Sequence, residues 1–269
     1  MTEHAQSDIK VIDEYGREAG HIPARHRAIY LLPNAFTTAA LFAGFFAIVK
    51  AMSHEFNIAA VAIFCAMVLD GMDGRVARLT NTQSAFGEQY DSLADMVSFG
   101  VAPALVVYEW QLHGLGTGRL GLIVAFIYTV CAALRLARFN INTDVIDKRF
   151  FQGLPSPSAA ALMAGMVWLV EEKDLPIPAE AIPYIAIVVT LFAGLSMITN
   201  VRYYSGKAMD LQHSVPFVKL LMFVGIMLCI IAWPPFALFG LFVAYALSGY
   251  IMWLWRWSKG ESLKKQRKT

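Results

Sequence analysis

The sequence predicts an all-α, polytopic membrane helix bundle with about eight transmembrane helices. Of its 269 residues, 57% are hydrophobic and 16% are charged, and the mean hydropathy is +0.52. Soluble domains average about 45–50% apolar and about 25% charged residues. The apolar excess lies in stretches close to the roughly 20 residues that a helix needs to cross a bilayer. Open sheets cannot span lipid, so helices are the expected elements.

Eight apolar stretches make up the predicted spans, and polar or turn-forming residues separate them. They cover residues 31–50, 56–78, 87–110, 118–138, 155–172, 182–199, 215–232 and 235–255. Trp233, Pro234 and Pro235 stand between the last two, which predicts a tight helical hairpin. The chain divides into an N-terminal tail (1–30), a transmembrane core with the first six spans (31–210), a C-terminal hairpin (211–257) and a basic tail (258–269).

Lysine and arginine positions predict the orientation of the spans. These residues gather in the two tails and at or after the ends of the second, fourth and sixth spans. The other loops contain only Lys50, Arg119 and Lys173. Because positive loops stay in the cytoplasm, both termini are expected there. The first 27 residues lack the apolar run of a signal peptide. The basic tail is interpreted as a flank near anionic headgroups, so no nucleic-acid partner is expected.

A fixed frame of carboxylates, small residues and an arginine lies where the second and third spans meet. Its pattern is D-x2-D-G-x2-A-R-x8-G-x3-D-x3-D. The members are Asp70, Asp73, Gly74, Ala77, Arg78, Gly87, Asp91 and Asp95. Carboxylates at membrane depth are costly, so such a cluster indicates a functional site.

The four aspartates of this frame are expected to converge. Asp70 and Asp73 share one face of the second span, and Asp91 and Asp95 share one face of the third. The 79–86 connection turns the two helices antiparallel, so the carboxylates can meet at the cytoplasmic side. Ligands that are all oxygen favour Mg²⁺ or Mn²⁺. The frame contains no His or Cys, which argues against zinc. Two such ions can clamp a phosphate, and a carboxylate free of metal can accept a proton from a hydroxyl.

The small residues of the frame allow two interpretations. Gly74, Ala77 and Gly87 leave room for a flat ring or a phosphate to approach the helix backbones. Membrane bundles also use small residues for close helix packing. Both interpretations stay open on the sequence alone.

The frame resembles the signature of the CDP-alcohol phosphotransferases, membrane enzymes that move a phosphatidyl or similar group from a CDP-linked donor to an alcohol. The resemblance implies a site for two Mg²⁺ or Mn²⁺ ions at the four aspartates. It implies that Asp91 and Asp95 are catalytic, with Asp95 as general base. The residues implied to bind the CDP moiety are Asp70, Asp73, Gly74, Ala77, Arg78 and Gly87.

More of the chain is similar to one branch of that family, the bacterial phosphatidylserine synthases. The similar stretches are 92–103, 134–140 and 153–157, with weaker matches at 32–37 and at 202–207, where Gly206 replaces a bulky apolar residue. The implied reaction joins CDP-diacylglycerol and L-serine to give phosphatidylserine and CMP. The branch also implies a homodimer in the bacterial cytoplasmic membrane, with the active site facing the cytoplasm.

Several polar residues outside the frame are candidates for contact with phosphate or serine. Arg135 and Arg138, ahead of Asn140, can pair with a donor phosphate or the serine carboxylate, or they can anchor the end of the fourth span. Contact with substrate is favoured, because the cytoplasmic end of the fourth span is expected to border the same site as the four aspartates.

Two further pairs leave a similar choice. Arg202 and Lys207 either contact a lipid phosphate or act as anchors, and anchoring is favoured. Asn34 and Thr37 either line the pocket or support the residues that line it, or they merely cap the first span.

Two alternatives to serine transfer remain. In the first, the protein is a related enzyme of the same family whose acceptor is a different alcohol, such as glycerol 3-phosphate or inositol phosphate. A cation or proton transporter also places carboxylates in the membrane. Transporters tend to hold such groups at the midplane between two related halves, whereas here they gather toward one face and no second half matches.

Overall fold

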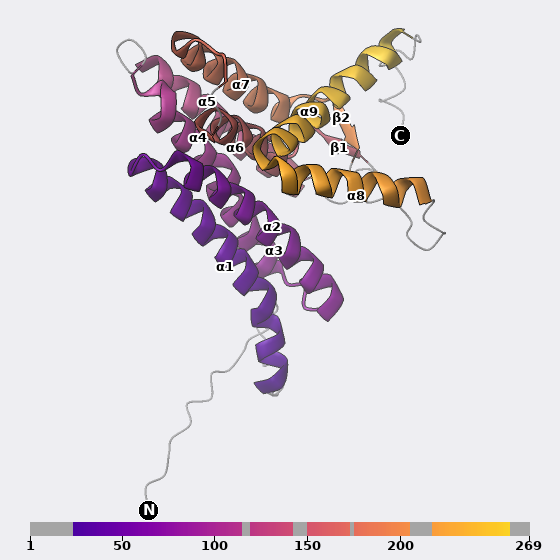
Figure 1. Cartoon of the computed structure of the whole chain (residues 1–269). Coiled ribbons are helices and arrows are strands. Elements are labelled where there is room, and N and C mark those ends of the chain that lie inside the picture. The colour runs from indigo at the N-terminus through magenta and orange to yellow at the C-terminus, as the bar shows by residue number, and fades with distance from the viewer. Residues whose placement is uncertain (1–23, 115–118, 142–149, 173–174, 205–216, 259–269) are drawn as a thin grey trace, which may run out of the picture.

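The computed structural model describes residues 24–114, 119–141, 150–172, 175–204 and 217–258. Within these ranges the chain is helical apart from one small sheet, which confirms the predicted all-α class (Figure 1). The outer parts of both predicted tails lie outside the described residues, and so does Lys207.

The first three helices form one side of the bundle. Helix α1 (Ala24–Met52) runs beside α2 (Phe56–Thr80) and also contacts α3 (Ala85–Asp95). Their interface is lined by alanines such as Ala47, Ala51 and Ala59, which are at most 1% exposed. Small side chains let membrane helices approach closely and gain van der Waals contact. Helix α1 therefore holds α2 and α3 in a fixed relation.

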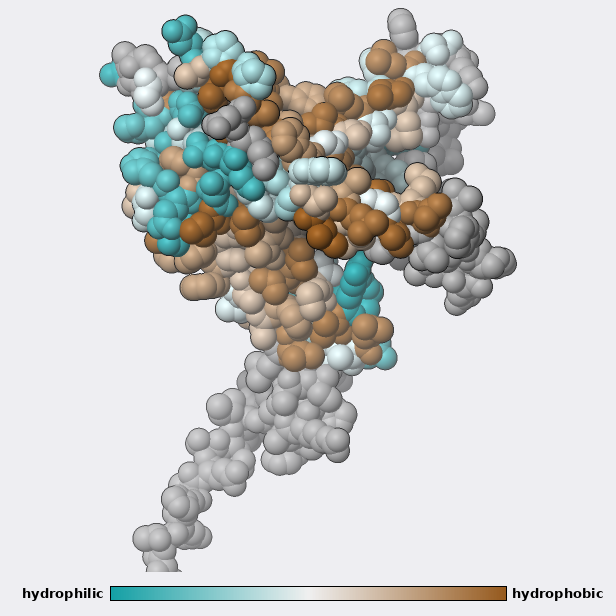
Figure 2. Space-filling view, in the orientation of Figure 1, coloured by the Kyte–Doolittle hydropathy of each residue, from teal (hydrophilic) through white to brown (hydrophobic). Residues whose placement is uncertain are grey.

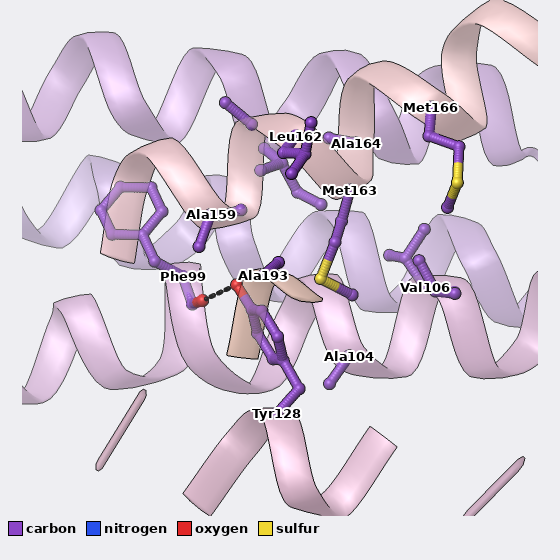
Figure 3. Packing of buried hydrophobic residues seen from close by; sticks show 14 of the residues in the cluster. Phe99, Ala104, Val106, Tyr128, Ala159, Leu162, Met163, Ala164, Met166 and Ala193 are labelled. Carbon is purple, nitrogen blue, oxygen red and sulfur yellow. Dashed lines mark hydrogen bonds between the residues drawn. The ribbon is translucent and has the colours of Figure 1, made fainter. Parts of the chain in front are cut away.

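The third predicted span is one continuous helical path with two wide, π-helical turns. Helix α3 continues through Met96–Val101, α4 (Ala102–Val107) and Tyr108–Leu112. Pro103 lies in the first turn of α4 and has no N–H to give to the Phe99 carbonyl four residues earlier. The Tyr128 hydroxyl donates to that carbonyl at 2.9 Å, as the dashed line in Figure 3 shows.

Helix α6 (Ser156–Glu172) forms the centre of the bundle. It is packed against α2, α4, α7 (Ile182–Ile198) and α9 (Pro234–Ser258). From Ala159 to Val167 every side chain is buried, and Figure 3 shows Ala159 and Met163 on the side of Phe99 and Tyr128. The many alanines and Gly165 leave room for neighbours on all sides. A helix that is apolar all round belongs in such an enclosed position.

A two-stranded antiparallel sheet joins the two loops beside α6. After α5 (Arg119–Ile141), β1 (Phe150–Gln152) pairs with β2 (Arg202–Tyr204), which follows α7 and its leading 3₁₀ turn Ala179–Ala181. Phe151 is opposite Tyr203 and Gln152 is opposite Arg202. The sequence predicts loops for both segments, and the structure differs. Aromatic residues favour strands, but the pairing is between distant residues and leaves no local periodic signal.

The C-terminal hairpin packs unevenly. Helix α8 (Phe217–Ala232) and α9 meet at a tight turn, where the Trp233 N–H donates to the Cys229 carbonyl at 2.9 Å. Helix α9 lies against α6, whereas α8 extends away from the helices of the core (Figure 1). The described side chains of α8 are apolar and mostly exposed, which suits contact with lipid.

The fold is that of an all-α polytopic membrane protein. Among the described residues, six helices are long and apolar enough to cross a bilayer: Leu32–Met52, Phe56–Thr80, Ala85–Leu112, Arg119–Ile141, Ala179–Ile198 and Pro234–Trp255. Helices α6 and α8, with 17 and 16 residues, are shorter, so eight crossings stay a prediction. Figure 2 shows hydrophobic residues over the middle of the bundle and hydrophilic residues gathered at its upper left.

Candidate active site

The turn between α2 and α3 places the four aspartates. Helix α2 ends at Thr80 and is capped by Asn81, which has φ of 52° and donates its N–H to the Arg78 carbonyl at 3.4 Å. Ser84 then caps α3, since its hydroxyl accepts the Gly87 N–H at 3.0 Å. An αL residue at the end of one helix and a serine at the start of the next are typical caps. The expected reversal between the two helices is therefore present.

Three carboxylates meet across this reversal. Oxygens of Asp70, Asp91 and Asp95 all lie within 4.8 Å of one another. Asp70 is within hydrogen-bonding reach of Asp95, and Asp73 is within reach of Asp91. Carboxylates this close repel when ionised, so they must share protons or bind cations. The structure brings the four predicted aspartates into one cluster.

Asp73 differs from the other three in its surroundings. It is 5% exposed, and the Thr37 hydroxyl donates to its Oδ2 at 2.8 Å. Its Oδ1 accepts the N–H of Gly74, and the charge of Arg78 lies within electrostatic reach. The Pro33 carbonyl of the same helix lies 3.2 Å from the Thr37 hydroxyl and is the more distant acceptor for its single proton. Of the two roles considered for Thr37, the geometry favours a group that orients Asp73.

The donor set fits a hard divalent cation. Oδ1 of Asp91 and Oδ1 of Asp95 are buried, and neither has a hydrogen-bond partner among the described residues. Buried carboxylate oxygens are rarely left without a partner. Carboxylate oxygens are also the ligands that Mg²⁺ and Mn²⁺ prefer. The cluster of Asp70, Asp91 and Asp95 can therefore hold a metal ion.

The small residues beside the aspartates border open space. A Cβ added at Gly71 would meet nothing within 4 Å, and one at Gly74 would meet only the Arg78 guanidinium, at 3.7 Å. Residues 71, 74 and 78 share one face of α2. At Gly87 the nearest atoms are Ser84 Oγ at 3.1 Å and Asn34 Oδ1 at 3.4 Å. The pocket interpretation is thus favoured over helix packing for Gly74, and Gly71 extends the same open face.

Arg135 is a cation that the fold brings next to Asp95. It is partly buried near the end of α5, and its Nη1 donates to the Ser156 hydroxyl at 2.6 Å. Asp95, Tyr128 and Tyr245 lie within its electrostatic reach. A guanidinium carries five N–H donors, so one bond to Ser156 leaves others for a ligand. Arg135 is well placed to bind an anion beside Asp95.

Arg138 and Asn140 are engaged by the surrounding loops. Nη2 of Arg138 donates to the Gln152 side chain and, at 2.7 Å, to Asn200 Oδ1. Arg138 therefore ties β1 to the segment before β2. The Asn140 amide donates to the Ser92 hydroxyl at 3.1 Å, which joins α5 to the turn of α3 that carries Asp91. Both residues support the site through these contacts.

The remaining candidates are Asn34, Ala77, Arg202 and Lys207. Asn34 is partly buried and close to Gly87, so the structure places it beside the start of α3. Ala77 is partly buried on α2, and Arg202 is exposed on β2. Lys207 falls outside the described residues.

Some residues of the site gave no individual signal in the sequence. Ser156 lies inside the similar stretch 153–157 without a signal of its own, and Gly71 adjoins the frame without belonging to it. Gln152, Asn200 and Tyr245 had no local pattern at all. Their roles come from contacts between segments far apart in the chain.

Comparison with known proteins identifies the family. The family model described as CDP-alcohol phosphatidyltransferase matches residues 30–198. The chain therefore belongs to the CDP-alcohol phosphatidyltransferase family, as the aspartate frame suggested. The match contains the four aspartates, Arg135 and Ser156, and it ends before β2 and the C-terminal hairpin.

Relatives from distant organisms have the same name. The chain is 37% identical over 227 residues to the CDP-diacylglycerol–serine O-phosphatidyltransferase of Helicobacter pylori strain 26695, covering 84% of this chain and 92% of the relative. A protein of that name from Methanocaldococcus jannaschii is 35% identical over 194 residues, which is 71% of this chain and 82% of the relative. One from Mycobacterium leprae is 41% identical over 154 residues, 55% of this chain and 50% of the relative.

Proposed function

We propose that this protein transfers the phosphatidyl group of CDP-diacylglycerol to the hydroxyl of L-serine, giving phosphatidylserine and CMP. The names of relatives at 35–41% identity support the reaction. The single observation that carries it is the cluster of Asp70, Asp91 and Asp95, whose oxygens lie within 4.8 Å of one another beside Arg135.

The aspartates form the metal and donor side of the site. Asp70, Asp91 and Asp95, with Asp73 beside them, would hold two Mg²⁺ or Mn²⁺ ions, which when bound polarise the phosphate and stabilise the leaving oxygen. Thr37 keeps Asp73 in place through its 2.8 Å bond. The open face at Gly74, with Ala77, Arg78 and Gly87, receives the CDP moiety.

Asp95 serves as the general base. It adjoins Arg135, and its Oδ1 has no hydrogen-bond partner among the described residues. It takes the proton of the serine hydroxyl, and the hydroxyl oxygen forms a bond to the lipid-side phosphorus. The bond from this phosphorus to the bridging oxygen of the pyrophosphate breaks, and CMP leaves with that oxygen. Asp91 holds the opposite side of the cluster.

The acceptor binds on the α5 and α6 side. Arg135 pairs with the serine carboxylate through the N–H groups that Ser156 does not use, since guanidinium and carboxylate form two parallel bonds. Arg138 and Asn140 hold the loops around this pocket. Asn34 borders the donor side. Arg202 and Lys207 are expected to anchor the loop after α7 at the membrane surface, with contact to a lipid phosphate as the alternative.

The site faces the cytoplasm of a bacterial cell from its inner membrane. The positive loops and tails support this orientation, and both polar substrates arrive from that side. The core is residues 31–210, the hairpin 211–257, and the tails 1–30 and 258–269 are cytoplasmic. The protein works as a homodimer, and cross-linking in lipid vesicles that traps only the monomer would contradict this.

The test is a direct assay of CMP release. Purified protein is given CDP-diacylglycerol, Mg²⁺ or Mn²⁺ and labelled serine. We expect CMP and labelled lipid to appear together, and Asp95→Asn to lower the rate by at least about 10²-fold, because it removes the base. Glu109→Gln, an acid-to-amide change further along the same helical path, is the matched control and should stay active.

Other outcomes separate the alternatives. Glycerol 3-phosphate or inositol phosphate in place of serine should give no CMP release. A protein that moves cations across vesicle membranes and releases no CMP would be a transporter. CMP release at the same rate with and without serine would refute serine as the acceptor.

A further inference from the structure

The strand pair fixes the segment that leads into the acceptor side of the site. Gly153 donates its N–H to the Val201 carbonyl at 2.8 Å. Its φ is +78°, and a Cβ there would lie 2.1 Å from the Met197 carbonyl oxygen, so only glycine fits. Ser156, which accepts the bond from Arg135, follows three residues later. The position of β2 and the residues before it therefore determines where Ser156 lies.

Tyr203 anchors β2 to the C-terminal helix. Its ring is fully buried against a notch on α9 formed by Ala246 and Gly249, here named the α9 notch. The Tyr203 hydroxyl donates to the Ala246 carbonyl at 3.1 Å. A Cβ at Gly249 would lie 2.5 Å from Tyr203 Cε1. Burial raises the pKa of the Tyr203 phenol, so the hydroxyl stays protonated and remains a donor.

Helix α9 reaches the site by a second route as well. Tyr245, one turn before Gly249, donates its hydroxyl to the Tyr204 carbonyl at 3.1 Å. Its ring centroid lies 5.6 Å from that of Tyr203, and Arg135 is within its electrostatic reach. All of these α9 residues lie beyond residues 30–198, the part matched by the family model.

We propose that the α9 notch positions the acceptor pocket, so that the C-terminal helix determines how well the amino-acid acceptor binds. Tyr203, seated in the notch, holds β2 and β1, and these hold Ser156 and Arg135 against the carboxylate of the acceptor. Tyr203 and Gly249 are positioning residues that act through Arg135. The inference rests on the proposed function. The donor side belongs to α1, α2 and α3 and does not depend on this series of contacts.

Gly249→Ala tests the notch, because the added methyl group must displace the Tyr203 ring. We expect the KM for serine to rise about tenfold while the KM for CDP-diacylglycerol stays within about twofold of the wild-type value. Gly240→Ala is the matched control, since it lies on the same helix with nothing within 4 Å of the new Cβ, and it should change neither constant. Arg135→Lys removes the proposed contact with the acceptor directly, so its KM for serine is the reference with which the KM of Gly249→Ala is compared.

Tyr203→Phe provides a second variant that keeps the ring and removes only the bond to Ala246. It should raise the KM for serine about twofold to threefold. If Gly249→Ala does not fold, this variant alone decides the test. Loss of folded enzyme lowers kcat alone, so a fall in kcat with both KM values unchanged would overturn the inference. An equal rise in both KM values would overturn it too. A wild-type protein that releases no CMP refutes the proposed function and the inference with it, whereas an active wild type with unaltered variants refutes the inference only.

Discussion

At the scale of single residues, the four aspartates differ in what surrounds them. Asp73 has a hydroxyl donor from Thr37 and a backbone donor from Gly74. Asp91 and Asp95 each keep one buried oxygen without a partner among the described residues. A carboxylate that is already satisfied is held rigid, and one with a vacant oxygen can take a cation or a proton. The frame therefore combines one fixed carboxylate, Asp73, with two whose buried oxygens can still take a cation or a proton.

The Thr37 contact gives a prediction at this scale. Thr37→Val keeps the shape of the side chain and removes the donor to Asp73, so we expect the affinity for Mn²⁺ to fall about tenfold, as is common when a ligand loses its orienting partner. Titration of CMP release with Mn²⁺ measures the change. Thr37→Ser keeps the hydroxyl and should resemble the wild type. Thr38→Val is the neighbouring control, and an equal loss there would argue against a specific role for Thr37.

At the scale of elements, the interrupted third span depends on a contact from another helix. Pro103 leaves the Phe99 carbonyl without its usual donor, and Tyr128 of α5 supplies one. Tyr128 is fully buried, so water cannot replace its hydroxyl. The wide turns that follow Asp95 are therefore stabilised by α5, the helix that also carries Arg135.

Removing this hydroxyl should destabilise the protein. Tyr128→Phe leaves a buried carbonyl short of a donor, at a cost of about 1–3 kcal/mol. For a chain of this size, that corresponds to a fall in Tm of roughly 2–10 °C. Thermal unfolding in detergent measures it, with Tyr184→Phe, an exposed tyrosine on α7, as the control. A Tm equal to that of the control would mean that the Phe99 carbonyl finds another donor.

The elements also show what the sequence can predict. Helices were predictable because apolar length is a local property, and the meeting of Asp70 with Asp91 and Asp95 followed from helical spacing and one short turn. The hydrogen bond between Arg135 and Ser156 was not predictable, since it joins two helices whose relative rotation depends on packing. Gly249 was equally hidden, because a glycine that receives a distant ring looks like any other glycine in an apolar run.

At the scale of the whole molecule, the number of crossings decides where the two ends lie. Six helices are long enough by themselves, and α6 and α8 are shorter than the roughly 20 residues of a typical span. Helix α6 is enclosed by other helices, and α8 is exposed and apolar. Both positions suit a helix within the membrane.

Eight crossings predict that both termini lie on the same side. Protease sites added at either end should be cut in inside-out vesicles and protected in sealed cells, because the positive tails stay in the cytoplasm. A site in the loop 173–178 should show the opposite pattern and serves as the control. Cleavage of the two ends from opposite sides would mean an odd number of crossings.

The short central helix has a consequence for how the two substrates meet. With 17 residues, α6 measures about 25 Å, several Å less than the roughly 30 Å depth of hydrocarbon. Ser156, which is fully buried, begins this helix, so we expect Ser156 to lie below the level of the lipid headgroups. On the proposed function, the water-soluble amino acid would then enter the protein to reach Arg135, while the lipid donor would react from within its own leaflet.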